Sequence, residues 1–408
     1  MSNVEKGVYQ LKGITRNYEW GGKEFLSKLL SISNSQQEPM AEYWLGAHET
    51  APSIVMNNGE SFLNQFIAAD KEKALGKTVA KRFGRLPYLL KILDVRDMLS
   101  IQVHPSKHMA EVEFARENKE KIPLTATHRN YKDDNHKPEL MVALSDFWLL
   151  HGFKPVEDLR KKLRSTPELI SLLRIFDETG YDQLYKTVME MPQQSVNDML
   201  GPLLNRIMPL YNKNLLKKNQ EDFWAARAAT TFNQAQKMDR GIFSIYFFNL
   251  LNLKPGEGIF QDSGVPHAYL EGQNVEIMAN SDNVLRGGLT IKHIDVKELM
   301  KNMKFEETIV TILHPQKTKE NEQHYKTAAP DFKLSRFQLK RDDTASFQSL
   351  TGEIVLVISG SVLFESGTAG LELSKGNAAF IIAHQKVNIK ALSDADVYRA
   401  SVPVHSND

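Results

Sequence analysis

Short apolar runs separated by Gly, Pro and Asn predict β-strands and tight turns in the first part of the chain, up to about residue 150. The clearest runs are PSIVMNNG, LPYLLKILDV, LSIQVHP and PELMVAL. One helix is expected among them, over SKHMAEVEFARENKE, where Ser106 is placed to cap the helix N-terminus. The pattern is typical of a β domain with one local helix.

The pattern changes after Pro155, where apolar residues begin to recur at helical spacing. Val156, Leu159 and Leu163 form the first such series, and glycine is scarce as far as Asp239. We therefore predict several helices in this part of the chain, with the apolar pattern of VNDMLGPLLNRIMPLYNKNLL interrupted at its two prolines. A packing lobe without chemistry is as compatible with this pattern as a lobe that contacts substrate.

Strand patterns resume with FSIYFFNLLNLKPGEGIF, and a short basic helix is expected over DVKELMKNMKF. Two β-hairpins with glycine at their turns are then predicted, in GEIVLVISGSVLFESG and LELSKGNAAFIIAH. The predicted fold class is mainly β with a helical insertion. One discontinuous β domain spans residues 1–152 and 240–313, a helical domain spans 153–239, and a second β domain spans 314–408.

The composition of the chain argues against several classes of binding partner and of chemistry. The 408 residues include 51 Lys and Arg against 50 Asp and Glu, which argues against nucleic-acid or membrane-surface binding. Cysteine is absent, so disulfides, thiol nucleophiles and Cys-ligated zinc are excluded. The N-terminus lacks the apolar core of a signal peptide, and the longest apolar runs are too short to cross a bilayer. A soluble cytoplasmic protein, acting as a monomer, is expected.

Candidate metal ligands stand at the polar edges of three apolar strands. Gln102 and His104 share one face of DMLSIQVHP, Glu139 opens the strand ELMVAL, and His267 follows the turns of KPGEGIFQDSGVP. Taken singly, each is more simply interpreted as a hydrogen-bonded histidine or a solvated strand end. Together, a buried carboxylate and two imidazoles need a partner, and a divalent metal supplies one. Zinc accepts such nitrogen and oxygen ligands, with the neutral amide as the weak member.

Several motifs resemble those of known families. The spacing Gly256-x5-Asp262-x-Gly264-x2-His267 is similar to the second motif of the cupin barrel, with Asp262 in place of the usual proline. NYEWGG, AEYWLGAHE, HKPE, GVPHAYLEG and NSDNVLRGGLT resemble, in order, segments of the type I mannose-6-phosphate isomerases. The resemblance covers nearly the whole chain. The resemblance is weaker over LRGGLTIKHIDV, at one edge of the pocket, where Gly288 and His293 stand in place of residues that are more common in the family.

The resemblance implies two cupin-type, jelly-roll β domains plus an all-α domain, and the interconversion of mannose 6-phosphate and fructose 6-phosphate through an enediol. It implies one Zn²⁺ per chain, bound by Gln102, His104, Glu139 and His267. It assigns Arg286 to catalysis. The candidates for the group that transfers the proton are a zinc-bound water, Lys137 and Asp282. It places Glu276 in the cleft, and the candidates for holding the substrate phosphate are Ser100, Lys91 and Lys292. A small phosphorylated sugar is then the expected partner.

Other interpretations stay open at this point. A non-catalytic bicupin that binds carbohydrate or stores metal needs no cation beside the metal, and an iron-dependent cupin oxygenase leaves Gln102 without a purpose. Arg286 is also consistent with a salt-bridging loop residue, Lys137 with a solvated side chain and Lys91 with a strand edge. Trp20 and Trp44 are expected in the core. The second β domain, in which His384 has no companion ligand, is expected to be metal-free.

Overall fold

A single long strand, β12 (His267–Ala279), organises the middle of the molecule, which is described by a computed structural model. The structure describes residues 7–57, 59–235, 237–318, 321–367 and 369–404. The first half of β12 pairs with β7 and β9, and its second half pairs with β6 and β8. Gly272 separates the halves at φ 132°, and a Cβ there would lie 2.6 Å from the Phe147 ring. One strand can therefore serve two sets of neighbours.

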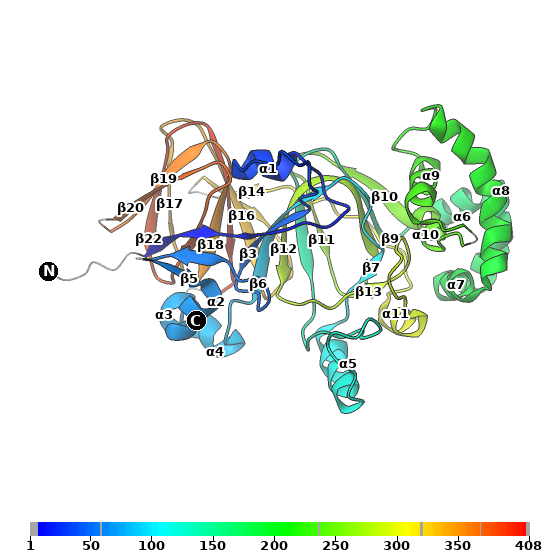
Figure 1. The fold of residues 1–408 in the computed structure, drawn as a ribbon, viewed down its shortest axis with the longest axis horizontal. Coiled ribbons are helices and arrows are strands. Elements are labelled where there is room, and N and C mark those ends of the chain that lie inside the picture. Colours follow the sequence, from blue (N-terminus) through cyan, green and yellow to red (C-terminus); the bar gives the residue numbers. More distant parts are fainter. Residues whose placement is uncertain (1–6, 58, 236, 319–320, 368, 405–408) are drawn as a thin grey trace.

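The strands of this central sheet come from two parts of the chain, residues 14–153 and 248–286. They are β2 (Ile14–Arg16), β3 (Glu42–Gly46), β6 (Tyr88–Val95), β7 (Gln102–Val103), β8 (Glu139–Ala143), β9 (Phe147–Phe153), β10 (Phe248–Leu253), β11 (Gly258–Gln261), β12 and β13 (Leu285–Arg286). Helices α5 (Lys107–Lys119) and α11 (Val296–Asn302) lie below it in Figure 1.

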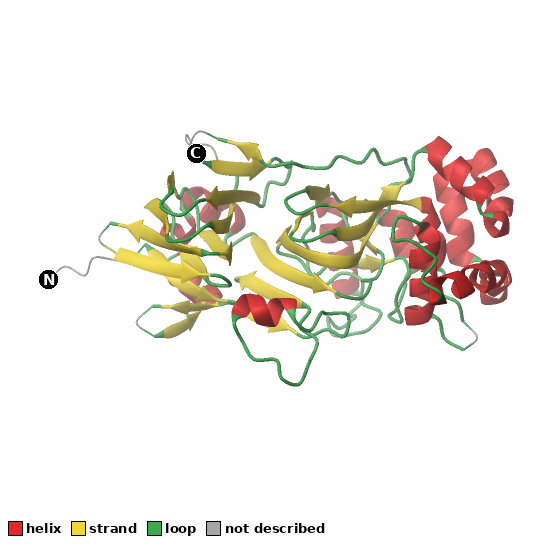
Figure 2. Ribbon diagram, turned by 90° about the horizontal axis from the view of Figure 1, so that it is seen from above, coloured by secondary structure: helices red, strands yellow, loops and turns green. Residues whose placement is uncertain are grey.

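Helices gather at one end of the molecule, beyond β9 and β10 (Figures 1 and 2). They are α6 (Val156–Ser165), the 3₁₀ turn η1 (Pro167–Leu169), α7 (Ile170–Glu190), α8 (Gln193–Asn212), α9 (Glu221–Phe232) and α10 (Gly241–Phe247). Their buried leucines and aromatic residues share one apolar cluster with Ile101, Val103 and Leu285 of the central sheet. The helical end is thus packed directly against the strands that carry the candidate site.

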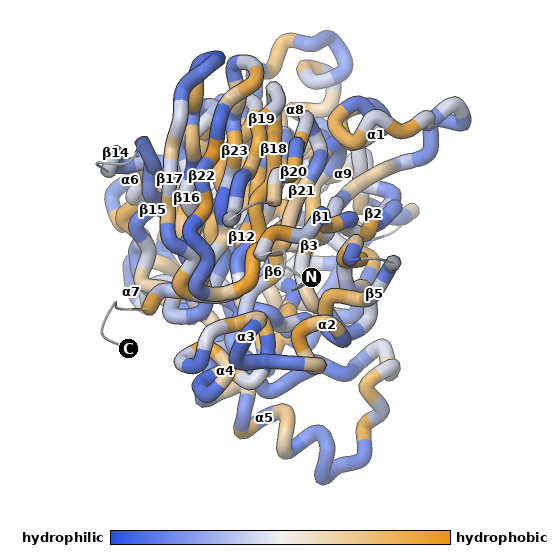
Figure 3. Tube along the Cα trace, turned by 90° about the vertical axis from the view of Figure 1, so that its left-hand side faces the viewer, coloured by the Kyte–Doolittle hydropathy of each residue, from blue (hydrophilic) through white to orange (hydrophobic). Residues whose placement is uncertain are grey.

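Two sheets pack face to face at the opposite end. The first contains, in order, β14 (Gln316–Lys317), β15 (Glu322–Tyr325), β16 (Lys333–Leu339), β23 (Ala395–Ser401), β18 (Glu353–Ser359), β21 (Ala378–Ile381), β1 (Val8–Lys12), β4 (Ile54–Met56) and β5 (Glu60–Phe62). The second contains β17 (Thr344–Gln348), β22 (Lys386–Ala391), β19 (Ser361–Ser366) and β20 (Ala369–Ser374). Hydrophilic and hydrophobic residues alternate along these strands, as expected for strands with one buried face (Figure 3).

The first sheet unites the two ends of the sequence. β1 lies between β21 and β4, with Val8 opposite Ile381 and Gln10 opposite Met56. The short helices α2 (Leu63–Ala69), α3 (Lys71–Leu75) and α4 (Lys77–Phe83) follow β5 at this end, and α1 (Phe25–Leu30) lies above it in Figure 1.

The predicted sheet-rich architecture with helices is confirmed, and so is the helix capped by Ser106, whose side chain accepts a hydrogen bond from the Met109 N–H. Trp44 is buried as expected, and Trp20 packs partly buried against the core. The interruption predicted at Pro202 and Pro209 is wrong, because α8 runs through both prolines and buries an apolar face. The strand predicted for FSIYF is also wrong, since these residues lie in α10; a fully buried apolar run does not distinguish helix from strand.

Both predicted C-terminal hairpins are wrong in the same way. Gly360 follows β18 and Gly376 follows β20, and both have positive φ, as a tight turn requires. However, β18 pairs with β21 and β23, whereas β19 pairs with β20 and β22. Each glycine therefore carries the chain from one sheet to the other, and the local sequence signal for a turn does not reveal which strands will pair.

Candidate metal centre

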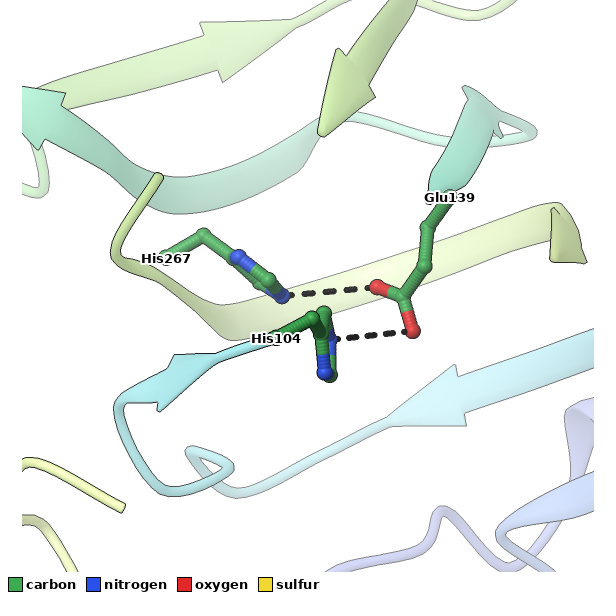
Figure 4. A group of neighbouring side chains, drawn as sticks. All are labelled: His104, Glu139 and His267. Atoms are coloured by element: carbon green, nitrogen blue, oxygen red, sulfur yellow. Dashed lines mark ion pairs between the residues drawn. The ribbon is translucent and has the colours of Figure 1, made fainter. Parts of the chain in front are cut away.

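Two imidazoles and a carboxylate converge at one point of the central sheet (Figure 4). His104 Nε2 lies 3.3 Å from Glu139 Oε1, and His267 Nε2 lies 3.3 Å from Glu139 Oε2. The potential ligand atoms of these three buried residues all lie within 4.8 Å of one another. His104 follows β7, Glu139 opens β8 and His267 opens β12, so three separate strands deliver the group.

Backbone carbonyls fix the orientation of both imidazoles. His104 Nδ1 lies 2.8 Å from the carbonyl oxygen of Asn283, and His267 Nδ1 lies 3.1 Å from that of Val265. Because a carbonyl oxygen only accepts hydrogen bonds, each Nδ1 must carry the proton in its neutral ring. Each Nε2 then presents a lone pair toward Glu139. Metal-binding histidines are commonly held by such second-layer hydrogen bonds.

The electrostatics of the group also fit a cation. Burial lowers the pKa of His104 to about 4, so the ring is neutral near pH 7. Burial alone would raise the pKa of Glu139, but the charge of Lys137 holds that pKa well below its usual range. His104 Nε2 is buried without a hydrogen bond of good geometry in the described part of the chain. A divalent cation bound by these atoms would satisfy the orphaned nitrogen.

Gln102 joins the group through the register of the sheet. Four residues form one row across β9, β12, β7 and β13: His151 lies opposite His267, His267 opposite Gln102, and Gln102 opposite Arg286. Directly opposed residues of antiparallel strands place their side chains on the same face. The structure therefore aligns the predicted amide ligand between a candidate metal-binding imidazole and the predicted catalytic guanidinium.

Arg286 stands out because its positive charge is not neutralised. Its guanidinium is half-buried and has no hydrogen-bond or ion-pair partner among the residues that the structure describes. Burial lowers its pKa, yet a guanidinium stays charged under these conditions. Burial lowers the pKa of Lys292, and the nearby charge of Arg286 lowers it further. Burial and the same charge also lower the pKa of Lys132. An anionic ligand would complement this group of cations.

Ser100 lies beside the Arg286 loop. The N–H of Ile101 donates to the oxygen of Gly288, and the N–H of Gly287 donates back to the oxygen of Ile101. The segment that carries Ser100 and Gln102 is therefore hydrogen-bonded to the loop that carries Arg286.

Lys91 lies deeper than a strand edge, among buried acids. Its ammonium is 3.3 Å from Glu276 and 3.7 Å from Glu42, and lies 4.9 Å from the centre of the Trp44 ring. Burial alone would lower the pKa of Lys91, but Glu42, Glu276 and Glu139 together raise it. Tyr269 donates a hydrogen bond of 2.8 Å to Glu276, whose pKa is raised by burial and by Glu139. Lys91 is therefore a permanently charged group.

Lys137 and Asp282 occupy different settings. Lys137 is buried, with its ammonium 3.1 Å from Glu139 Oε1. The side chain of Asp282 is 50% exposed, and His48 Nε2 lies 3.3 Å from one of its oxygens. The hydrogen bond with His48 lowers the pKa of Asp282, which is therefore ionised at neutral pH.

Some residues of this region were not predicted from the sequence. They are Glu42, His48, Lys132, His151, Tyr269 and Asn283. Four of them lie within the quoted motifs AEYWLGAHE, GVPHAYLEG and NSDNVLRGGLT, so motif position could have indicated Glu42, His48, Tyr269 and Asn283. His151 is visible only through strand pairing, because no local pattern links it to His267.

Comparisons with known proteins give the family. Residues 8–156 match the family model described as phosphomannose isomerase type I, catalytic domain. The mannose-6-phosphate isomerase of Escherichia coli (strain K12) is 37% identical over 385 residues, covering 93% of this chain and 95% of that protein. This chain belongs to the type I phosphomannose isomerase family. The Homo sapiens mannose-6-phosphate isomerase is 33% identical over 431 residues, covering 96% of this chain and 98% of that protein.

Solved structures of phosphomannose isomerases share the fold. One is the Salmonella typhimurium mannose-6-phosphate isomerase bound to its substrate (f6p) and a zinc atom. It is 33% identical, covers 98% of this chain and 100% of its own, and superposes with a TM-score of 0.89. A zinc-bound mannose 6-phosphate isomerase superposes with a TM-score of 0.88. In this chain, no helix among the described residues combines the length and apolar character needed to cross a membrane.

Proposed function

We propose that this protein is a zinc-dependent aldose-ketose isomerase that interconverts mannose 6-phosphate and fructose 6-phosphate. The observation that carries the proposal is the convergence of His104 Nε2 and His267 Nε2 on Glu139, with each Nδ1 tied to a backbone carbonyl. Family membership supports the same activity, because the related proteins carry that name over nearly their full length.

The proposed metal site holds one Zn²⁺ through His104, Glu139 and His267, with Gln102 as a fourth and weaker ligand. The donor set of two nitrogens and oxygens without sulfur suits zinc. A bound zinc ion would act as a Lewis acid that stabilises negative charge on the sugar oxygens.

The isomerisation moves protons without net redox change. One proton leaves C2 and one is delivered to C1, while a hydroxyl proton moves from O2 to O1. Arg286 is proposed to stabilise the oxygen charge that develops, since its half-buried guanidinium lacks any other partner in the described chain. Lys137 and Asp282 are the proposed candidates for carrying the proton. Lys137 is buried beside Glu139. Asp282 is half-exposed and lies four residues before Arg286 in the sequence.

The substrate phosphate is proposed to lie near Lys292 and Ser100, on the side of the sheet that carries the Arg286 loop. Lys91 remains a proposed substrate-binding residue together with Glu276, with which it forms an ion pair. Because Lys91 already balances two carboxylates, we favour a contact with sugar hydroxyl groups over one with the phosphate.

We further propose that the central and C-terminal sheets are two cupin-type jelly rolls and that the segment 153–239 is a separate helical domain. The face-to-face packing of the two C-terminal sheets, and the glycine turns that pass between them, support the jelly-roll assignment. The C-terminal cupin is proposed to be metal-free and the enzyme to be a monomer.

Metal analysis combined with a coupled assay tests the proposed function. The purified protein should contain about one zinc per chain, and production of fructose 6-phosphate from mannose 6-phosphate should cease on chelation and return with zinc. Bound zinc without turnover would favour the non-catalytic bicupin. Bound iron with oxygen consumption would favour an oxygenase, and either result would overturn the proposal.

A further inference from the structure

A second site lies at the opposite end of the molecule from the helices. A cavity of about 440 Å³ opens between β15, β16, β17, β18, β22 and β23. Its polar and aromatic walls include Lys333, Phe347, Glu353, Lys386, Arg399 and Ser401. None of the residues that line it belongs to the candidate metal centre.

The cavity lies where the apolar interior between the two C-terminal sheets gives way to charge. On three neighbouring strands, the residues of the inner face change from apolar to charged at the same end of the sheet. The apolar residue and the charged residue on each are Val397 and Arg399 on β23, Val355 and Glu353 on β18, and Phe337 and Lys333 on β16. Since alternate residues of a strand share a face, these charges point into the same interior as the core.

The floor of the cavity is a saturated ion-pair network. Arg399 donates two hydrogen bonds to Glu353, of 2.6 and 2.9 Å, and one of 2.7 Å to Glu322. All three side chains are buried, and the Phe347 ring covers the guanidinium at 4.0 Å. Both carboxylates are therefore already engaged by a cation, so the cavity is poorly suited to a second positive ligand.

The two lysines of the cavity are different. Neither ammonium, of Lys333 or of Lys386, has a hydrogen-bond or ion-pair partner in the described part of the chain. Lys333 is half-buried, and burial lowers its pKa. Ser401 lies directly opposite Lys333 across β16 and β23 and also lines the cavity. The free hydrogen-bonding capacity at the opening thus includes two ammonium groups and a hydroxyl.

We propose that this cavity binds a small anion that carries phosphate or carboxylate oxygens, with Lys333 and Lys386 as its charged contacts. A structural ion pair would explain Arg399 and its two glutamates. Those glutamates also attract the half-buried Lys333, but its ammonium has no direct hydrogen-bond or ion-pair partner in the described chain. An anion supplies that partner, and the rigid floor below fixes the position of the strands that carry the lysines.

Calorimetric titration of the zinc-loaded, full-length protein tests the site. Sodium orthophosphate and sodium succinate are the probes, and they distinguish a phosphate ligand from a carboxylate ligand. The variants are Lys333→Met, the charge-preserving Lys333→Arg, and Lys390→Met as a matched control. Lys390 lies on the same strand as Lys386 at its other end and does not line the cavity.

We expect at least one probe to bind the wild-type protein, and Lys333→Met to weaken one binding event at least about tenfold. Lys333→Arg and Lys390→Met should retain it, and all variants should keep the wild-type melting temperature and KM for mannose 6-phosphate. The proposal is overturned if neither probe binds, if Lys333→Met and Lys390→Met bind alike, or if mannose 6-phosphate displaces every bound probe. Because isomerisation is measured separately, failure of this site leaves the proposed function standing, and the reverse also holds.

Discussion

His104 and Asn283 are joined by a hydrogen bond of 2.8 Å between the imidazole Nδ1 and the backbone oxygen. The position of that oxygen depends on the Asn283 side chain. Its amide accepts from the N–H of Lys132 at 2.7 Å and donates to the oxygens of Asp133 and Asn135 at 2.8 and 2.9 Å. An asparagine that touches no metal thus sets the orientation of a proposed metal ligand.

Asn283→Ala should therefore weaken zinc binding by about 10- to 100-fold, because the loop would no longer hold the carbonyl in place. Competition with a zinc-binding dye measures the affinity. Asn252→Ala is a suitable control, since the Asn252 amide nitrogen lacks a partner in the described chain. Equal affinities in the two variants would contradict the role of Asn283.

Gln102 and His104 should differ in their importance for zinc. Replacing His104 by Ala removes a ligand that is oriented by Asn283, so we expect zinc to be lost during gel filtration. Replacing Gln102 by Ala removes a neutral amide, so zinc should remain bound with affinity lowered by about tenfold. Elemental analysis of both variants after buffer exchange provides the measurement. If Gln102→Ala loses its zinc and His104→Ala does not, the ranking is reversed.

Arg286→Met should lower kcat by about 10²-fold or more, because a preorganised charge beside the reacting oxygens would be lost. Its melting temperature should be unchanged or higher, since the substitution removes a half-buried charge that has no partner in the described chain. Arg399→Met, by contrast, should destabilise the fold by about 3–5 kcal/mol, because it leaves Glu322 and Glu353 buried without their cation. Similar losses of stability in both variants would argue that Arg286 is a structural residue.

His151 gives a pH dependence whose sign follows from its burial. Burial lowers the pKa of His151 to about 3 in the folded protein, against an ordinary value near 6.5 in the unfolded chain. The unfolded state therefore binds the proton first as pH falls, and the free energy of unfolding should decrease between about pH 6.5 and pH 3.

His151→Phe keeps a ring of similar shape and removes this titration. The variant should lose less stability than the wild type on acidification, by up to about 1.4 kcal/mol per pH unit within that range. Urea denaturation of the metal-free proteins at several pH values measures the difference. His384→Phe, at an exposed position, is the control and should leave the pH dependence unchanged.

The sequence predicts the convergence of His104, Glu139 and His267 because each candidate ligand stands beside a strong local signal. Gln102 and His104 alternate with buried Ile101 and Val103, and a strand end follows at Pro105. The motifs around Glu139 and His267 then identify the other two strands. No such signal exists for His151, because strand pairing between distant segments, and not spacing along the chain, brings it opposite His267.

The same distinction explains the errors in the fold. Gly360 and Gly376 were predicted as hairpin turns because they separate two apolar runs, and both do adopt positive φ. Whether the next strand pairs with the previous one or crosses to the facing sheet depends on the whole core. Likewise, the apolar segment of α10 is buried on all sides, so neither a helical nor an alternating pattern remains to be detected.

The insertion of β1 between β21 and β4 has a consequence for biosynthesis. β1 (Val8–Lys12) leaves the ribosome long before its neighbour β21 (Ala378–Ile381) is made. Until β21 has been made, β1 pairs only with β4, and its other edge has no partner strand. A chaperone that shields the free edge of β1 would thus protect the nascent chain until β21 emerges.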